Sequence, residues 1–456
     1  MENNTEIPPA AEENFNKKAK ALIKLIKEVE FDNQGDANNS DLHSRVTITD
    51  KDIVGEVEMF SSNEKGKVMG RFFKYMDSHY GIVDDDFEKL RDVSQNIQRL
   101  NAFKLILSQN FIENHLFNWC VESFKAHAIT NPFIEYLKLQ AEAAVKEQKV
   151  YVPIANLIVD KEFKFCGVLI SGLTKPLADE IYKSSISMAK NEGAKSRFEK
   201  FFDNFRSKYQ GYALALLKFK CEPELAHNLA TNKVQRLISI LSIYHRSILI
   251  HDIKCPISIK GSEYSPYTTS FEISDEFLLL SLTEKPVDLA SLRPWRIKEN
   301  DVIKFNEVGM SHLSVLASQD NKTEFQDMIL NMAYLYSKAS FSNDPMEKLI
   351  LMLSSLESSL LKNQSESIQQ NIAERLSMLI AEKLQDRKAI IKNLKEVYSL
   401  RSKYLHHGHS SQDIKNLSQF FLNMWVFYVQ LITSEKHAFK TKAEFLEYID
   451  DYKLSH

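Results

Sequence analysis

Two residues near position 400 have side chains that could together cleave an RNA phosphodiester: Arg401, and His406 five positions later. A guanidinium is always charged and can hold a phosphate as a planar fork. An imidazole titrates near neutrality and can move a proton at the 2′-hydroxyl or at the leaving 5′-oxygen. We therefore interpret Arg401 and His406 as candidate catalytic residues. His407, which directly precedes Gly408, is the alternative for the histidine role.

The spacing of this pair is a weak signal by itself, because a motif this short also arises by chance. Arg246 and His251 are separated by the same number of residues. That second pair lies in an apolar stretch of helical pattern without a neighbouring basic cluster, so we interpret it as structural.

The surroundings of Arg401 favour a phosphate-binding role. Seven basic residues face only two acidic residues over 383–409, although the whole chain has a formal charge of −3. A local excess of positive charge can bind a polyanion, whereas the alternative is the solvated face of an ordinary helix. The candidate RNA contacts are Lys388, Lys392, Lys403 and His409.

Glu357 lies in the middle of an apolar helical stripe, where a carboxylate is costly unless it is paired or hydrogen-bonded. Arg401 and Arg375 are its natural partners, and we expect Glu357 to orient the arginine fork. The alternative places Glu357 at the edge of the stripe, in contact with water. Tyr404 is a second candidate supporting residue. The stripe consists of Met346, Leu349, Ile350, Leu353, Leu360 and Leu361.

The elements that would position these residues are helices. No proline follows Pro345, and Gly408 is the only glycine after Gly309. A long segment with so few helix breakers predicts an all-α bundle over 320–456. The expected helices cover 323–341, 345–361, 368–384, 386–405 and 411–433, with a short last helix that begins at a Thr441 and Glu444 capping box.

The preceding region, 45–319, has mixed patterns and predicts an α+β fold. Alternating residues suggest strands within 45–60, at 163–165 and at 257–259, whereas 85–128 and 196–251 have helical spacing. Residues 1–44 are polar and are expected to form a flexible segment.

Composition excludes several classes of protein. The chain has 456 residues, 44% of them hydrophobic and 26% charged, which is typical of a globular protein with more than one domain. Neither a signal peptide nor a membrane-spanning stretch is evident, and four dispersed cysteines argue against zinc and disulfides. Motifs for nucleotide hydrolysis, dinucleotide binding and serine hydrolysis are missing, so we expect a cytoplasmic protein without cofactor or metal.

Together, these residues resemble the Apea-like branch of the HEPN superfamily over roughly 320–435. The resemblance rests on Leu-Glu357-Ser-Ser-Leu-Leu in one helix and on Tyr398-x-x-Arg401-Ser402-Lys-x-Leu-His406-x-Gly408 at the end of another. Members of the superfamily are helical bundles that commonly dimerise so that two such motifs face each other. Many are metal-independent endoribonucleases of antiviral defence or toxin systems.

The resemblance implies a cytoplasmic endoribonuclease that acts as a homodimer through its C-terminal bundle and cuts RNA by 2′-hydroxyl attack. Region 45–319 would then sense a trigger or restrain the nuclease. The alternative is a catalytically inactive dimerisation module that binds RNA or a nucleotide. A third interpretation is a purely structural oligomerisation domain.

Overall fold

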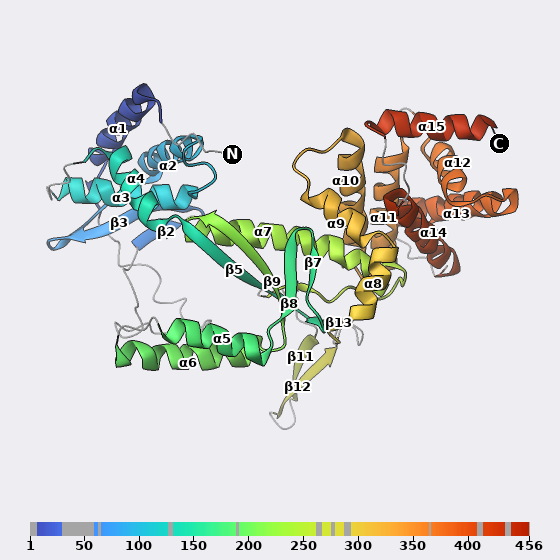
Figure 1. Ribbon diagram of the computed structural model, residues 1–456, viewed down its shortest axis with the longest axis horizontal. Coiled ribbons are helices and arrows are strands. Elements are labelled where there is room, and N and C mark those ends of the chain that lie inside the picture. The colour runs from blue at the N-terminus through green and yellow to red at the C-terminus, as the bar shows by residue number, and fades with distance from the viewer. Residues whose placement is uncertain are drawn as a thin grey trace. The chain divides into compact units, whose positions relative to one another are not determined.

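The computed structural model has an α+β N-terminal region followed by a C-terminal region of helices (Figure 1), as the sequence predicts. The expected strands within 45–58 lie outside the described residues. The structure describes residues 7–29, 59–62, 65–125, 131–187, 191–260, 267–274, 279–286, 293–363, 366–407, 414–433 and 439–455.

The chain forms two compact units that are interleaved in sequence. Unit 1 comprises residues 1–149 and 218–229, and unit 2 comprises residues 150–217 and 230–456. The C-terminal helices therefore share a unit with most of the middle region. The domain boundaries that the sequence suggests, after residues 44 and 319, remain predictions.

Unit 1 contains a four-stranded antiparallel sheet whose order is β1-β4-β3-β2. The strands are β1 (Lys27–Glu28), β2 (Met59–Ser62), β3 (Val68–Tyr75) and β4 (Ser78–Val83). Its helices are α1 (Pro9–Ile23), α2 (Asp84–Gln98), α3 (Gln109–Phe124) and α4 (Phe133–Ala144). Side chains from these helices share one core with Ile82 of the sheet.

Helix α1 corrects the expectation of a flexible segment over 1–44. Phe15, Ala19 and Leu22 are buried in the core of unit 1. They stand four and three positions apart, so they form one apolar stripe within a segment of polar composition. That stripe anchors residues 9–23 to the core.

Unit 2 is built on a five-stranded sheet of order β10-β5-β9-β8-β7. A two-residue turn joins β7 to β8, and both of its residues have positive φ, 49° at Cys166 and 73° at Gly167. This conformation matches the twist of an antiparallel hairpin. The strands are β5 (Lys146–Ala155), β7 (Phe163–Phe165), β8 (Val168–Gly172), β9 (Ala213–Cys221) and β10 (Ser258–Ile259).

The expectation of helix over 196–251 is wrong at β9. Residues 213–217 form a nearly continuous apolar run, and β9 lies between two other strands of the sheet. A strand with neighbours on both sides and buried faces lacks the alternation that identifies strands in sequence. Helices flank β9 in the chain: α5 (Lys175–Ile186) and α6 (Glu192–Tyr209) before it, and α7 (Pro223–Leu241) after it.

The remaining elements of unit 2 belong neither to the five-stranded sheet nor to the C-terminal bundle. Two 3₁₀ turns, Ser242–Tyr244 and Arg246–Ile248, follow α7 directly. The others are the parallel pair β6 (Leu157–Val159) and β13 (Trp295–Ile297), the hairpin of β11 (Tyr267–Ser274) and β12 (Leu279–Pro286), and helices α8 (Glu299–Glu307) and α9 (Met310–Ser318).

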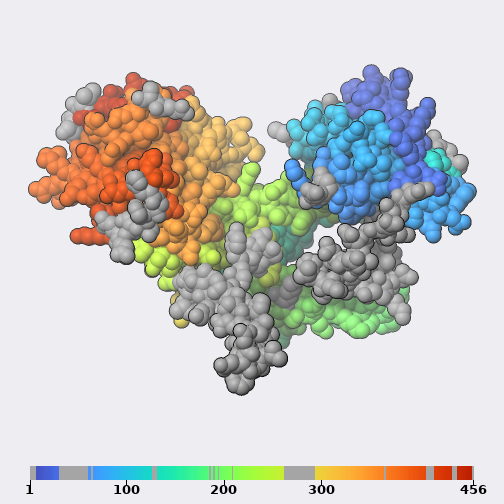
Figure 2. Space-filling view, turned by 180° about the vertical axis from the view of Figure 1, so that it is seen from behind, coloured from blue at the N-terminus to red at the C-terminus, as the bar shows by residue number. Residues whose placement is uncertain are grey.

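The predicted helices of the C-terminal bundle are confirmed (Figure 1, yellow-orange to red). Thr323 and Asp344 cap α10 and α11 with their side chains, and Pro345 occupies the first position of α11. In the space-filling view these helices form one compact body (Figure 2). They are α10 (Glu324–Ala339), α11 (Pro345–Leu360), α12 (Ile368–Ile380), α13 (Leu384–His407), α14 (Ile414–Thr433) and α15 (Lys442–Ser455).

A buried lysine ties α11 to the segment after α7. Lys348 is fully buried, and its Nζ donates to the carbonyl oxygens of Ser247 at 2.6 Å, Ile250 at 2.7 Å and Ile253 at 2.6 Å. All three ammonium N–H groups therefore have acceptors. We call this arrangement the lysine clasp.

Among the described helices, none combines the length and the apolar character that crossing a membrane requires.

Candidate active site

Helix α13 positions Arg401. Ile390, Leu394 and Val397 are buried and hold one face of this helix against the bundle. Arg401 lies one turn beyond Val397 on the same face, so its side chain is directed toward α11 rather than toward bulk water. Its side chain is 28% exposed.

Helix α11 presents Glu357 to Arg401. Leu353, Leu356 and Leu360 are fully buried around it, whereas the side chain of Glu357 is 19% exposed. The carboxylate thus lies at the border of the apolar stripe and is paired. Glu357 is thus paired with Arg401, as one interpretation of the sequence expected, and it also lies at the edge of the stripe, as the other expected.

Two side chains donate hydrogen bonds to one carboxylate oxygen of Glu357. Arg401 Nη1 donates to Glu357 Oε1 at 2.9 Å, and the hydroxyl of Tyr398 donates to the same oxygen at 3.0 Å. Burial raises the pKa of Tyr398, and the negative charge of Glu357 raises it further. The phenol therefore remains a neutral donor. We call these residues the Tyr-Glu-Arg triad.

The triad leaves part of its hydrogen-bonding capacity unused. Glu357 Oε2 accepts no hydrogen bond from any residue that the structure describes. Arg401 Nε is buried and, within the same described residues, has no acceptor. An unsatisfied buried donor costs about 1–3 kcal/mol, and native proteins retain few of them. This imbalance distinguishes the triad from a fully satisfied structural ion pair.

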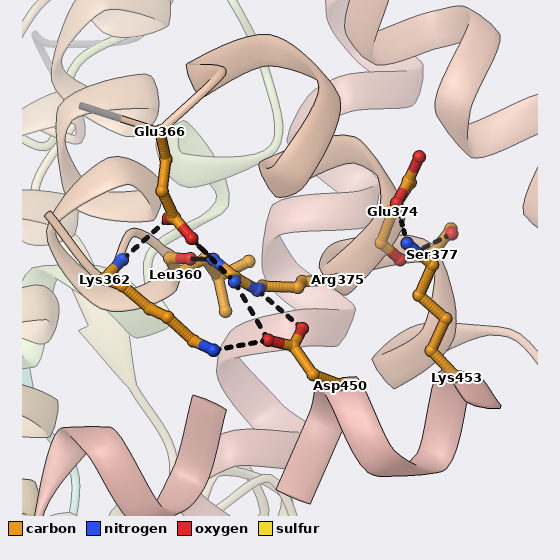
Figure 3. Close-up of polar contacts among 8 residues, drawn as sticks. All are labelled: Leu360, Lys362, Glu366, Glu374, Arg375, Ser377, Asp450 and Lys453. Carbon is orange, nitrogen blue, oxygen red and sulfur yellow. Dashed lines mark hydrogen bonds and ion pairs between the residues drawn. The ribbon is translucent and has the colours of Figure 1, made fainter. Parts of the chain in front are cut away.

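Arg375, the other predicted partner of Glu357, belongs to a different cluster (Figure 3). Its side chain is 4% exposed and donates to Glu366, to Asp450 and to the carbonyl oxygen of Leu360, at 2.7–3.2 Å. The hydrogen bonds from Arg375 hold the pKa of Glu366 below its usual value. This cluster joins α15 to α12 and to the end of α11, and its arginine has no unused donor.

His406 lies on the exposed surface of α13. Five residues of regular helix separate it from Arg401 by about 140° around the axis and about 7.5 Å along it. The two candidate catalytic side chains of one chain therefore project in different directions. The side chain of His407, together with Gly408 and His409, lies outside the described residues.

The predicted RNA contacts on α13 are exposed and share one side of the helix with His406. Lys388, Lys392 and Lys403 lie, with His406, within an arc of about 60°. Lys392 Nζ is 3.9 Å from Glu396, which is a weak surface pair. We call these four residues the basic stripe.

Tyr398 is the member of the triad that the site prediction left out, while Tyr404 was included. Tyr404 is half-buried, yet the hydrogen bonds of Glu357 and Arg401 involve Tyr398. The available signal was position: Tyr398 precedes Arg401 by three residues, which places both side chains on neighbouring parts of one helix surface.

Comparisons with known proteins found no match, whether to family models, to curated proteins or to solved structures. Within the described residues, no three His, Cys, Asp or Glu side chains gather in a way that could hold a metal ion.

Proposed function

We propose that the C-terminal bundle is an Apea-like HEPN endoribonuclease that cleaves RNA by 2′-hydroxyl attack without a metal ion. The observation that carries the proposal is the Tyr-Glu-Arg triad. Its arginine is held in place by a carboxylate while further N–H groups remain without an acceptor in the described chain. Such an arginine is suited to binding a phosphate and stabilising the charge that develops on it.

The basic stripe supplies the remaining affinity for the polyanion. Lysine ammonium groups along a helix contact phosphates without reading sequence. Lys388 and His406 lie about 27 Å apart along α13, which is long enough to follow several phosphates. Binding would then guide the RNA toward the C-terminal end of α13.

The proposed active form is a homodimer with a composite site. Arg401 and His406 of one chain project about 140° apart, so the His406 that lies near Arg401 in the proposed site comes from a second chain. A two-fold axis brings the same surface of two protomers together. The like charges of the two helix ends oppose this contact unless a phosphate lies between them.

The middle region, 45–319, then serves as the sensor or restraint of a cytoplasmic defence or toxin effector. This role follows from the family resemblance.

The test is incubation of the purified protein with total RNA in EDTA. We expect fragments that end in cyclic phosphate or 3′-phosphate, and we expect Arg401→Ala to reduce them strongly. Arg246→Ala is the matched control, because Arg246 also precedes a histidine by five residues but is exposed. Cleavage that depends on added metal would contradict the mechanism.

One observation favours a second candidate, a module that binds RNA or a nucleotide without cutting it. Arg401 and His406 are separated on the helix, so a protein that never forms the composite site would bind phosphate and not cleave. RNA binding that depends on Arg401, without any fragments, would identify this alternative.

A further inference from the structure

We infer that Glu357 is the general base of the proposed reaction and not only the residue that orients Arg401. The inference rests on the proposed function. Cleavage by 2′-hydroxyl attack benefits from a base on one side of the phosphorus and an acid on the other. Arginine cannot serve as the base because it does not deprotonate in proteins. The triad contains one group that can accept a proton, which is Glu357.

The two oxygens of Glu357 have different surroundings. Oε1 accepts from both Tyr398 and Arg401, and Oε2 accepts from no residue that the structure describes. Two hydrogen bonds to one oxygen fix the plane of the carboxylate. Because both oxygens are bonded to the same carbon, Oε2 lies close to the oxygen that binds the guanidinium, and its lone pairs are available.

The exposure of the pair is compatible with contact to substrate. The side chains of Glu357 and Arg401 are 19% and 28% exposed, so the pair is neither sealed in the core nor fully solvated. A phosphate that accepts from Arg401 would bring its own ribose close to Glu357. This geometry differs from that of Glu366, whose two oxygens both accept from Arg375.

The proton and electron balance of the step is complete. Glu357 Oε2 removes the proton of the 2′-hydroxyl, and the 2′-oxygen forms a bond to phosphorus. The bond from phosphorus to the 5′-oxygen breaks, and its electron pair leaves with that oxygen. A histidine imidazolium, in the proposed dimer the partner's His406, protonates the 5′-oxygen. The products are a 2′,3′-cyclic phosphate and a 5′-hydroxyl end.

The experiment compares two substrates, an RNA oligonucleotide and a uridine 3′-aryl phosphate whose leaving group needs no proton. Glu357→Gln keeps the shape of the side chain and removes the base. We expect kcat on both substrates to fall by the same factor, about a hundredfold or more. A loss confined to RNA would assign an acid role to Glu357 and overturn the inference.

A double-mutant cycle separates a base from a positioning residue. A base retains its effect when Arg401 is absent, so Glu357→Gln should also slow the Arg401→Ala enzyme on the aryl substrate. No further loss in that background would mean that Glu357 acts only through Arg401. Glu366→Gln is the matched control, since it also removes a carboxylate from an arginine of the bundle, and its activity should match that of wild type.

Failure of the inference is distinguishable from failure of the proposed function. A wild-type protein that cleaves neither substrate in EDTA, while thermal melting shows it folded, overturns both. A wild-type protein that cleaves both substrates while Glu357→Gln retains its rate overturns the inference alone.

Discussion

Glu357 and Arg401 form more than a charge pair, because Tyr398 donates to the same carboxylate oxygen. Each donor limits the freedom of the other, so the orientation of the guanidinium depends on a residue that carries no charge. The raised pKa of Tyr398, which burial causes first and Glu357 second, preserves this donor well into alkaline solution. The triad therefore combines a neutral donor and a charged donor that share one charged acceptor.

Tyr398→Phe tests the neutral hydrogen bond. A hydrogen bond to a charged group contributes about 1.5–3 kcal/mol, and the bond from Arg401 remains, so we expect kcat/KM for RNA to fall about tenfold. Tyr404→Phe is the matched control, since Tyr404 shares no hydrogen bond with the triad in the described structure. An equal loss in both variants would mean that the hydrogen bond from Tyr398 to Glu357 has no special role.

The lysine clasp predicts a pH dependence of stability. Burial lowers the pKa of Lys348 to about 8, below the value of about 10.4 expected in the unfolded chain. Between these values the unfolded state binds more protons, so stability contributed by this group rises with pH. The free energy of unfolding of wild type, relative to Lys348→Met, should increase from pH 7.5 to pH 10 by up to about 3 kcal/mol. A difference that stays constant over this range would refute the assignment.

Among the elements, α15 packs on the bundle through buried apolar side chains and is also joined to it by a buried arginine of α12. Arg375 is buried and bridges Glu366 and Asp450, and both carboxylates also contact Lys362 (Figure 3). Removing Arg375 takes from Glu366 its two side-chain donors and leaves Asp450 with Lys362. The neighbouring pair of Lys453 and Glu374 is more exposed. The two ion pairs of this one region therefore differ in how much they contribute to stability.

Arg375→Met should destabilise the protein by about 3–5 kcal/mol, because it breaks a buried pair and leaves Glu366 without the side chain that donates to it. Lys453→Met is the matched control and should cost at most about 1 kcal/mol. Urea unfolding followed by circular dichroism measures both midpoints. Similar midpoints for the two variants would show that the Arg375 cluster is not a special anchor of α15.

The basic stripe of α13 predicts a salt effect on RNA binding. If Lys388 and Lys392 each neutralise one phosphate, replacing both with alanine should reduce the slope of log K against log salt by about 1.4–1.8. Affinity should fall to a similar extent for RNAs of different sequence. Replacing the exposed Lys298 and Lys304 of the α8 region is the control. An unchanged slope would indicate that the stripe is a solvated face.

The bundle helices were predictable because their signals are local. Thr323, Asp344 and Pro345 mark helix starts that depend only on neighbouring residues. Strand β9 was not predictable in this way, since a buried strand owes its conformation to the strands on either side. The pairing of Glu357 with Arg401 instead of Arg375 also depends on tertiary packing, because both arginines satisfied the requirement of charge.

At the scale of the whole molecule, the proposed base and acid come from different chains. In the proposed dimer, Glu357 and Arg401 belong to one protomer and the histidine belongs to its partner. Mixing Arg401→Ala protomers with His406→Ala protomers should restore activity, because one complete site forms in each mixed dimer. Mixing Arg401→Ala with Glu357→Gln should not, because both residues act in the same protomer.

The same mixture with His407→Ala in place of His406→Ala determines which histidine takes part. Sedimentation of the wild-type protein measures whether it is a monomer or a dimer under the assay conditions. Full activity of a strictly monomeric wild-type protein would contradict the composite site.

The lysine clasp has a practical consequence for dissecting the protein. A fragment that starts at residue 320 contains Lys348 and the triad, yet it lacks the carbonyl oxygens of Ser247, Ile250 and Ile253. Its ammonium group would lose all three acceptors at once, in the helix that also carries Glu357. A fragment that preserves the lysine clasp must therefore include the second 3₁₀ turn, which begins at Arg246, well upstream of the first helix of the bundle.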